Sequence, residues 1–86
     1  MQPETGVPAE LTVDERLDVL GLACPMPLLK AKQALNRLAP GALLEVRATD
    51  PGSERDFEVF ARQSGHELLV SRREQDQFLY VLRKKR

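Results

Sequence analysis

The chain has 86 residues, which is the size of a single domain. Its 13 lysine and arginine residues balance its 13 aspartate and glutamate residues, which argues against a protein whose whole surface binds nucleic acid or a membrane. The longest uncharged apolar stretch, residues 19–29, contains two prolines and has about half the length of a membrane span. The first residues, MQPETGVPAELTVDE, lack the basic start and apolar run of a signal peptide. We therefore expect a cytoplasmic protein without membrane association.

The beginning of the chain predicts an arm followed by a strand. Residues 1–13 are rich in proline, glycine and charged side chains, and they predict a flexible arm before one domain at 14–86. The segment RLDVLG at 16–21 alternates apolar and polar residues, which predicts a short strand that ends at Gly21.

Residues 26–38 predict an amphipathic helix. Apolar residues recur there at spacings of three and four, and the breakers Pro40 and Gly41 follow. The residues expected on the buried face are Leu28, Ala31, Ala34, Leu35 and Leu38.

The second half of the chain repeats this order and then adds a hairpin. LLEVRAT at 43–49 predicts a strand, and DPG at 50–52 predicts a turn. Ser53 with Asp56 three residues later predicts a capping box at the start of a second helix, which ends before Gly65. That helix is expected to bury Phe57, Phe60, Ala61 and Ser64 on one face.

HELLVSR at 66–72 and FLYVLR at 78–83 predict two closing strands, with Gln75 and Asp76 near their turn. The resulting order is β-α-β-α-β-β. A sheet with one apolar face and two amphipathic helices predicts a two-layer α/β sandwich.

The chain contains one cysteine, Cys24, and one histidine, His66. One cysteine cannot form a disulfide within the chain, and these two residues cannot supply the four ligands of a structural zinc site. No pairing of Cys24 with a histidine base can be inferred from their positions, which disfavours a hydrolytic cysteine enzyme. We expect no metal and no cofactor, and a free thiol in a reducing compartment.

Cys24 stands immediately before Pro-x-Pro at the predicted start of the first helix. As the helix cap it would face free backbone N–H groups and the positive end of the helix dipole. Pro25 would then occupy the first helical position, and the amides of Met26 and Leu28 would remain free to face the sulfur. This arrangement predicts a thiol pKa below the ordinary value of about 8.5. The alternative is that Cys24 is a small buried apolar residue without chemistry.

Other residues could support the thiol or contact a partner. Lys30 and Lys32 follow on the predicted helix and could add a positive field or contact an acidic partner. If the first two strands are parallel, their ends share one edge, which would bring Asp50 and Ser53 near Cys24. Leu29 falls off the apolar stripe and could belong to a docking patch, whereas Met26 is expected to pack within the loop.

Several segments resemble the TusA/SirA-like sulfur-carrier family. LDVLGLACPMPLLKAKQAL at 17–35 has the pattern of that family, a short strand, Gly-Leu, and Cys-Pro-x-Pro opening a helix. ATDPGSERDF at 48–57 resembles the family's second strand-to-helix segment, and GHELL and YVLRK resemble its end. The resemblance covers residues 16–84 and leaves out the arm.

The resemblance implies the β-α-β-α-β-β sandwich, similar to the C-terminal domain of translation initiation factor three. It implies that Cys24 carries sulfur as a persulfide between proteins, with Gly21, Pro25 and Pro27 shaping its loop. The implied donor is a cysteine desulfurase or another sulfur-donor protein. The implied acceptors belong to tRNA thiolation, sulfur oxidation or molybdenum-cofactor assembly. We expect a monomer that does not bind nucleic acid directly.

Two other functions stay open from the sequence. The fold resemblance and the basic RKKR tail allow a regulatory or nucleic-acid-binding module, although nucleic-acid-binding sheets usually expose aromatic residues. A structural domain with an inert cysteine is the third possibility.

Overall fold

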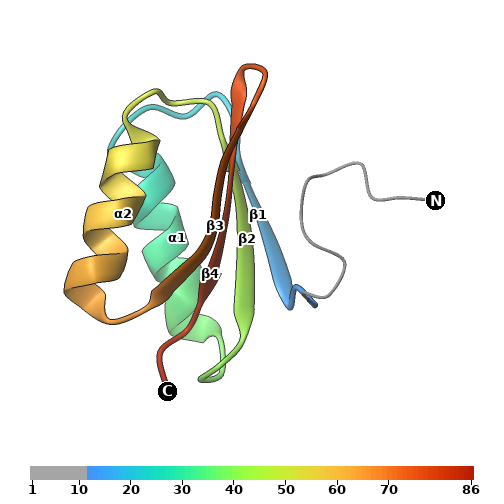
Figure 1. Cartoon of the computed structure of the whole chain (residues 1–86), viewed down its shortest axis with the longest axis vertical. Coiled ribbons are helices and arrows are strands. Elements are labelled where there is room, and N and C mark those ends of the chain that lie inside the picture. Colours follow the sequence, from blue (N-terminus) through green and yellow to red (C-terminus); the bar gives the residue numbers. More distant parts are fainter. Residues whose placement is uncertain (1–11) are drawn as a thin grey trace.

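The computed structural model describes residues 12–86, and most of the predicted arm lies outside this range. The elements follow in the order β1 (Glu15–Val19), α1 (Met26–Arg37), β2 (Leu43–Ala48), α2 (Ser53–Ser64), β3 (Glu67–Glu74) and β4 (Gln77–Arg83). Both helices lie on the same face of one four-stranded sheet (Figure 1). The predicted order and the two-layer α/β sandwich are therefore confirmed. None of the helices in the described part is long and apolar enough to cross a bilayer.

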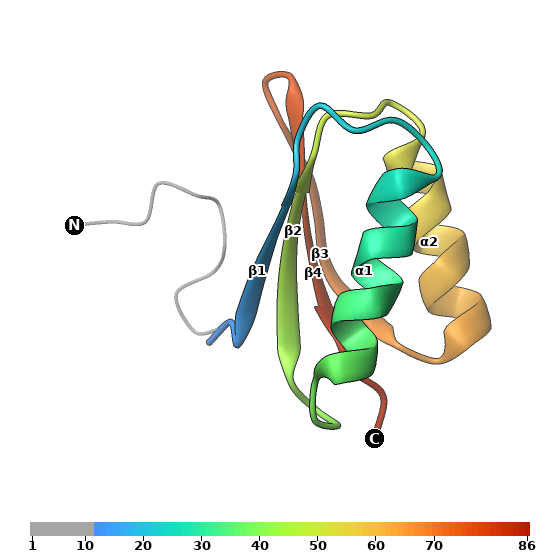
Figure 2. The same ribbon diagram turned by 180° about the vertical axis from the view of Figure 1, so that it is seen from behind.

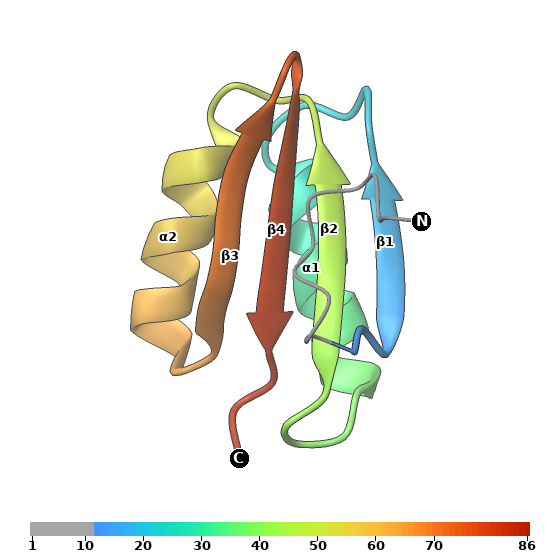
Figure 3. The same ribbon diagram turned by 45° about the vertical axis from the view of Figure 1, so that its right-hand side comes forward.

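The sheet has the strand order β1-β2-β4-β3, seen face-on in Figure 3. β1 and β2 are parallel, with Val19 opposite Ala48, and β4 is antiparallel to both of its neighbours. Because parallel strands end at the same edge of a sheet, the β1–α1 and β2–α2 loops leave that edge together. The two loops run side by side in Figure 1 and in the opposite view of Figure 2.

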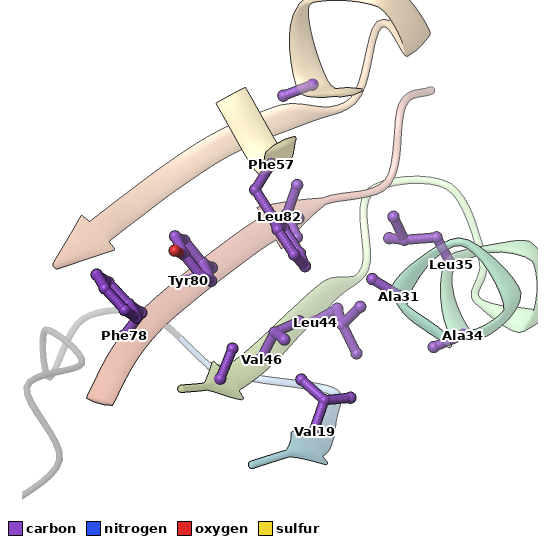
Figure 4. Packing of buried hydrophobic residues seen from close by; sticks show 12 residues of the cluster. Val19, Ala31, Ala34, Leu35, Leu44, Val46, Phe57, Phe78, Tyr80 and Leu82 are labelled. Carbon is purple, nitrogen blue, oxygen red and sulfur yellow. The ribbon is translucent and has the colours of Figure 1, made fainter. Parts of the chain in front are cut away.

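The hydrophobic core fills the space between the sheet and the two helices (Figure 4). Strand residues alternate, so that every second side chain of β2 and β4 points to the helices. The small residues Ala31 and Ala34 let α1 lie close to the sheet, whereas α2 contributes the large ring of Phe57 to the core. The fully buried core members include Val19, Ala31, Ala34, Leu35, Leu44, Val46, Phe57, Tyr80 and Leu82. Leu28, Leu38 and Phe60 are half-buried at its margin.

The start of α2 differs from the prediction. Gly52 is the cap residue, no side chain caps the helix, and the predicted capping box of Ser53 and Asp56 is therefore wrong. Ser53 is buried, and its hydroxyl is hydrogen-bonded to the Tyr80 hydroxyl at 2.7 Å. Burial raises the pKa of Tyr80 to about 12, so the buried phenol stays neutral and needs this partner.

A carboxylate on the sheet face away from the helices is also buried. Glu45 alternates with core residues of β2, and its side chain is ion-paired with Arg16 at 3.1 Å and with Arg47 at 3.2 Å. Arg47 also reaches Glu74 on β3 at 3.3 Å. Because two arginines neutralise this carboxylate, Glu45 has a structural role in the sheet and is not a candidate for acid–base chemistry.

Candidate functional site around Cys24

Cys24 lies in the β1–α1 loop, and its side chain is exposed. The loop is attached to the sheet at Gly21, whose N–H donates to the Thr49 hydroxyl at the end of β2 over 2.8 Å. Gly21 has a φ of 80°, in the left-handed region where any other residue except asparagine or aspartate is strained. Gly21 therefore turns the chain and ties the loop to the end of β2.

The helix α1 begins at Met26 as predicted, but its cap residue is Pro25 and not Cys24. Leu29 N–H donates to the Pro25 carbonyl at 3.0 Å, which makes Pro25 the cap and places Cys24 just before it. Met26 N–H donates to the Ala23 carbonyl at 2.9 Å. This amide closes a turn ahead of the helix, so the prediction that it faces the sulfur is wrong.

Pro27 lies at the second position of α1, and it is buried. Pro27 has no N–H, but this costs the helix nothing, because an N–H in the first turn has no acceptor within the helix. Its buried ring packs at the first turn. Pro27 therefore contributes to packing as well as to the stiffness of the loop, whereas Pro25 is exposed.

Two carboxylates act on the thiol. Hydrogen bonding to the side chain of Asp56 on the first turns of α2, partial desolvation and the negative charges of Asp56 and Asp50 raise the pKa of Cys24 above its ordinary value. The predicted lowering of this pKa is therefore wrong, because the helix terminus was considered without the acidic residues that the neighbouring loop brings.

Asp50 lies near Cys24, as the parallel pairing of the first two strands predicted. Its Oδ2 atom is buried and has no hydrogen-bond partner among residues 12–86. Ser53 was expected beside it but turns into the core toward Tyr80. Asp56 was missed as a site residue, although the same topology that brings Asp50 to this edge also brings the first turns of α2.

Exposed apolar side chains lie near the thiol in the sequence. Leu20, Met26 and Leu29 are 36%, 38% and 44% exposed. The prediction of an exposed Leu29 is confirmed, whereas Met26 is not packed within the loop. Lys30, the next residue, is half-buried.

A shallow groove of about 190 Å³ lies between α1 and α2. Its lining includes Leu28, Lys32, Asp56 and Phe60. Lys32 Nζ lies 5.6 Å from the centroid of the Phe60 ring, a cation–π distance. The structure thus brings Leu28 and Lys32 together with the Asp56 carboxylate.

The structure offers no cluster of three or more histidine, cysteine, aspartate or glutamate side chains for a metal ion within residues 12–86. The site consists of one exposed thiol, two carboxylates that act on it, and exposed apolar side chains near it in the sequence. Such a thiol can take up a group and pass it on.

Comparison with known proteins places this arrangement in a family. The family model described as "Sulfurtransferase TusA" matches residues 15–84. The chain is 48% identical over 71 residues to a "Sulfur carrier protein TusA" of Allochromatium vinosum, covering 83% of this chain and 93% of that protein. A protein of the same name from Pseudomonas syringae is 47% identical over 75 residues, covering 87% of this chain and 89% of the relative.

The fold is similar to that of a SirA-like protein from Desulfitobacterium hafniense. The TM-score of the two structures is 0.73 at 22% sequence identity, and the match covers 84% of this chain and 99% of the other. The family match, which includes Cys24, and the two relatives decide the assignment: the chain belongs to the TusA family of sulfurtransferases.

Proposed function

We propose that this protein is a sulfur carrier that takes sulfur onto Cys24 as a persulfide and passes it to an acceptor protein. The observation that carries the proposal is the exposure of the chain's only cysteine, in the loop between β1 and α1, within a chain of this family. An inert structural cysteine would be expected in the core, where free cysteines usually lie.

The loading step conserves protons and electrons. The Cys24 sulfur attacks the outer sulfur of a donor-protein persulfide, and the sulfur–sulfur bond of the donor breaks. The donor cysteine leaves as a thiolate and takes up the proton that Cys24 has lost. The products are a Cys24 persulfide and a donor thiol. A cysteine desulfurase is the proposed donor, and the reverse chemistry on an acceptor cysteine would unload the carrier.

Partner recognition is proposed to use the exposed apolar side chains around the thiol. Leu20, Met26 and Leu29 lie near Cys24 in the chain, and burying them against another protein would stabilise a complex. Lys30 and Lys32 would add contacts to acidic groups of the partner.

We expect Leu29→Glu to slow sulfur transfer from a desulfurase about tenfold or more at low protein concentration. The change places a charge where an apolar contact would be buried, and a loss of about 1.4 kcal/mol in binding corresponds to tenfold. The measurement is the initial rate of persulfide formation against carrier concentration.

Leu69→Glu is the matched control, because Leu69 is 36% exposed but lies on β3, at the opposite edge of the sheet from β1. It should leave transfer unchanged. Equal slowing by both variants would show that the apolar surround of Cys24 has no special part in docking.

The nucleic-acid alternative receives no support from the aromatic residues. Phe57, Phe78 and Tyr80 are buried in the core between the sheet and the helices. The remaining ring, Phe60, lies under Lys32 and 5.6 Å from the His66 ring. No ring in the described part offers the open face on which bases stack.

Incubation with a cysteine desulfurase and L-cysteine tests the function directly. We expect intact-mass spectrometry to show one added sulfur, removable by a reductant. The Allochromatium vinosum relative serves as the comparison in the same assay. If that relative gains sulfur and this chain does not, the proposed function is wrong.

A further inference from the structure

The hydrogen bond from Gly21 to Thr49 links the loop that carries Cys24 to a different part of the fold. This loop, residues 20–25, lies between the end of β1 and the start of α1, whereas Thr49 directly follows β2. The Gly21 nitrogen lies 2.8 Å from Thr49 Oγ1, and the two residues are 28 positions apart in the sequence. The parallel pairing of β1 with β2 brings them together at one edge of the sheet (Figure 1).

The loop has one polar and one apolar attachment to the rest of the domain. Nothing packs around Gly21, since a Cβ atom added there would meet no atom within 4 Å beyond its chain neighbours. The Leu22 side chain packs against the core, and its N–H donates to the Val19 carbonyl at 3.2 Å. This second bond is local and shapes the turn from within. The Thr49 hydroxyl therefore ties the loop to the neighbouring strand where packing does not.

Gly21 stands between two groups that a partner must meet together. Leu20, directly before it, is 36% exposed and belongs to the residues proposed to contact a partner. Cys24, which follows shortly after, is exposed as well. A partner that buries Leu20 needs the sulfur within reach at the same time. The relative placement of these two side chains depends on how the chain is held at Gly21.

We infer that Thr49 is a positioning residue of the carrier, whose hydroxyl holds the Cys24 loop in the orientation that a docking partner needs. The inference rests on the proposed function and gives Thr49 no part in the chemistry of the sulfur. The hydrogen bond is exposed, so water can replace the hydroxyl as the acceptor of the Gly21 N–H. Loss of the hydroxyl should therefore loosen the loop without unfolding the domain.

The test is the rate of loading of Thr49→Val by a cysteine desulfurase and L-cysteine, measured against carrier concentration. Valine keeps the branched shape of threonine but cannot accept a hydrogen bond. The net contribution of one hydrogen bond corresponds to a factor of about two to ten in a population. When the productive orientation is populated less by this factor, the apparent affinity falls equally. We expect kcat/KM to fall about two- to tenfold and kcat at saturating carrier to stay unchanged.

Two variants and a small reagent separate positioning from other effects. Thr49→Ser keeps the hydroxyl and should restore loading. Ser71→Ala removes an exposed hydroxyl on β3, at the opposite edge of the sheet from β1, and should leave loading unchanged. A small neutral disulfide needs no docking to reach the exposed sulfur, so it should react with Cys24 at the same rate in Thr49→Val and in the parental protein.

Hydrogen exchange measures the loop in the absence of any partner. The amides of Leu22 and Met26 form hydrogen bonds near the two ends of the loop, so their exchange with solvent reports on its opening. Both should exchange about two- to tenfold faster in Thr49→Val than in the parental protein, and Thr49→Ser should restore the slower rates.

The inference is overturned if Thr49→Val keeps the parental kcat/KM, if Thr49→Ser is as slow as Thr49→Val, or if Ser71→Ala shows the same loss. Equal slowing with the small disulfide would place the effect on the thiol and would overturn it too. Failure of the parental protein to load would contradict the proposed function. The exchange rates would then still decide whether Thr49 holds the loop, and unchanged rates would overturn that role.

Discussion

Replacing Cys24 by serine is expected to abolish sulfur loading completely and to leave the fold intact. Cys24 is the only sulfur nucleophile of the chain apart from the unreactive methionine thioethers, so no other residue can accept a persulfide sulfur. The side chain is exposed and has no place in the core, so the free energy of unfolding should change by less than about 0.5 kcal/mol. Intact-mass spectrometry after incubation with a desulfurase and thermal unfolding measure the two effects.

Cys24→Ala removes the polar group as well as the sulfur. Serine keeps a hydroxyl and alanine does not, yet both variants should fail to gain sulfur. Persulfide found on either variant would contradict the assignment of Cys24 as carrier. A large loss of stability in both would show that the cysteine has a structural role instead.

The order of elements could be predicted because each one has a local signature. The face of α1 is set by Ala31, Ala34 and Leu35, whose spacing appears in the sequence and whose side chains are fully buried. The hairpin turn at Gln75 and the glycine after α2 are likewise local, since Gln75 has a φ of 59° and Gly65 one of 88°. Such positions depend on backbone conformation within a few residues.

The surroundings of Cys24 could be predicted only in part. The parallel pairing of two strands was sufficient to place Asp50 at the correct edge. The Ser53 hydroxyl is hydrogen-bonded to Tyr80, 27 positions away in the sequence. The need of the buried Tyr80 hydroxyl for a partner outweighs the gain from capping the helix locally. The effect of Asp56 on the pKa of the thiol likewise depends on how α2 packs against the sheet, which no spacing in the sequence records.

The shift of the α1 cap from Cys24 to Pro25 had a larger consequence for chemistry than for structure. The sequence shows that a helix begins near Pro25, but not which carbonyl accepts its first hydrogen bond. With Met26 N–H bound to Ala23, one of the donors expected to stabilise a thiolate is already used. The direction of the Cys24 pKa then follows from the acidic residues across the loop.

The second large effect concerns the stability of the fold and is expected when the buried Phe57 of α2 is replaced by alanine. Phe57 is fully buried, and its ring stacks on that of Tyr80 with centroids 4.6 Å apart and planes 5° from parallel. We expect Phe57→Ala to lower the free energy of unfolding by about 3–5 kcal/mol, because neighbouring side chains cannot fill the cavity that the lost ring would leave. Domains of this size are stable by only about 5–15 kcal/mol, so the melting temperature should fall by more than about ten degrees.

Phe60→Ala is the control on the same helix. Phe60 is half-buried at the edge of the core, so its loss should cost clearly less than that of Phe57. A melting temperature no lower than that of Phe60→Ala would show that α2 is anchored elsewhere.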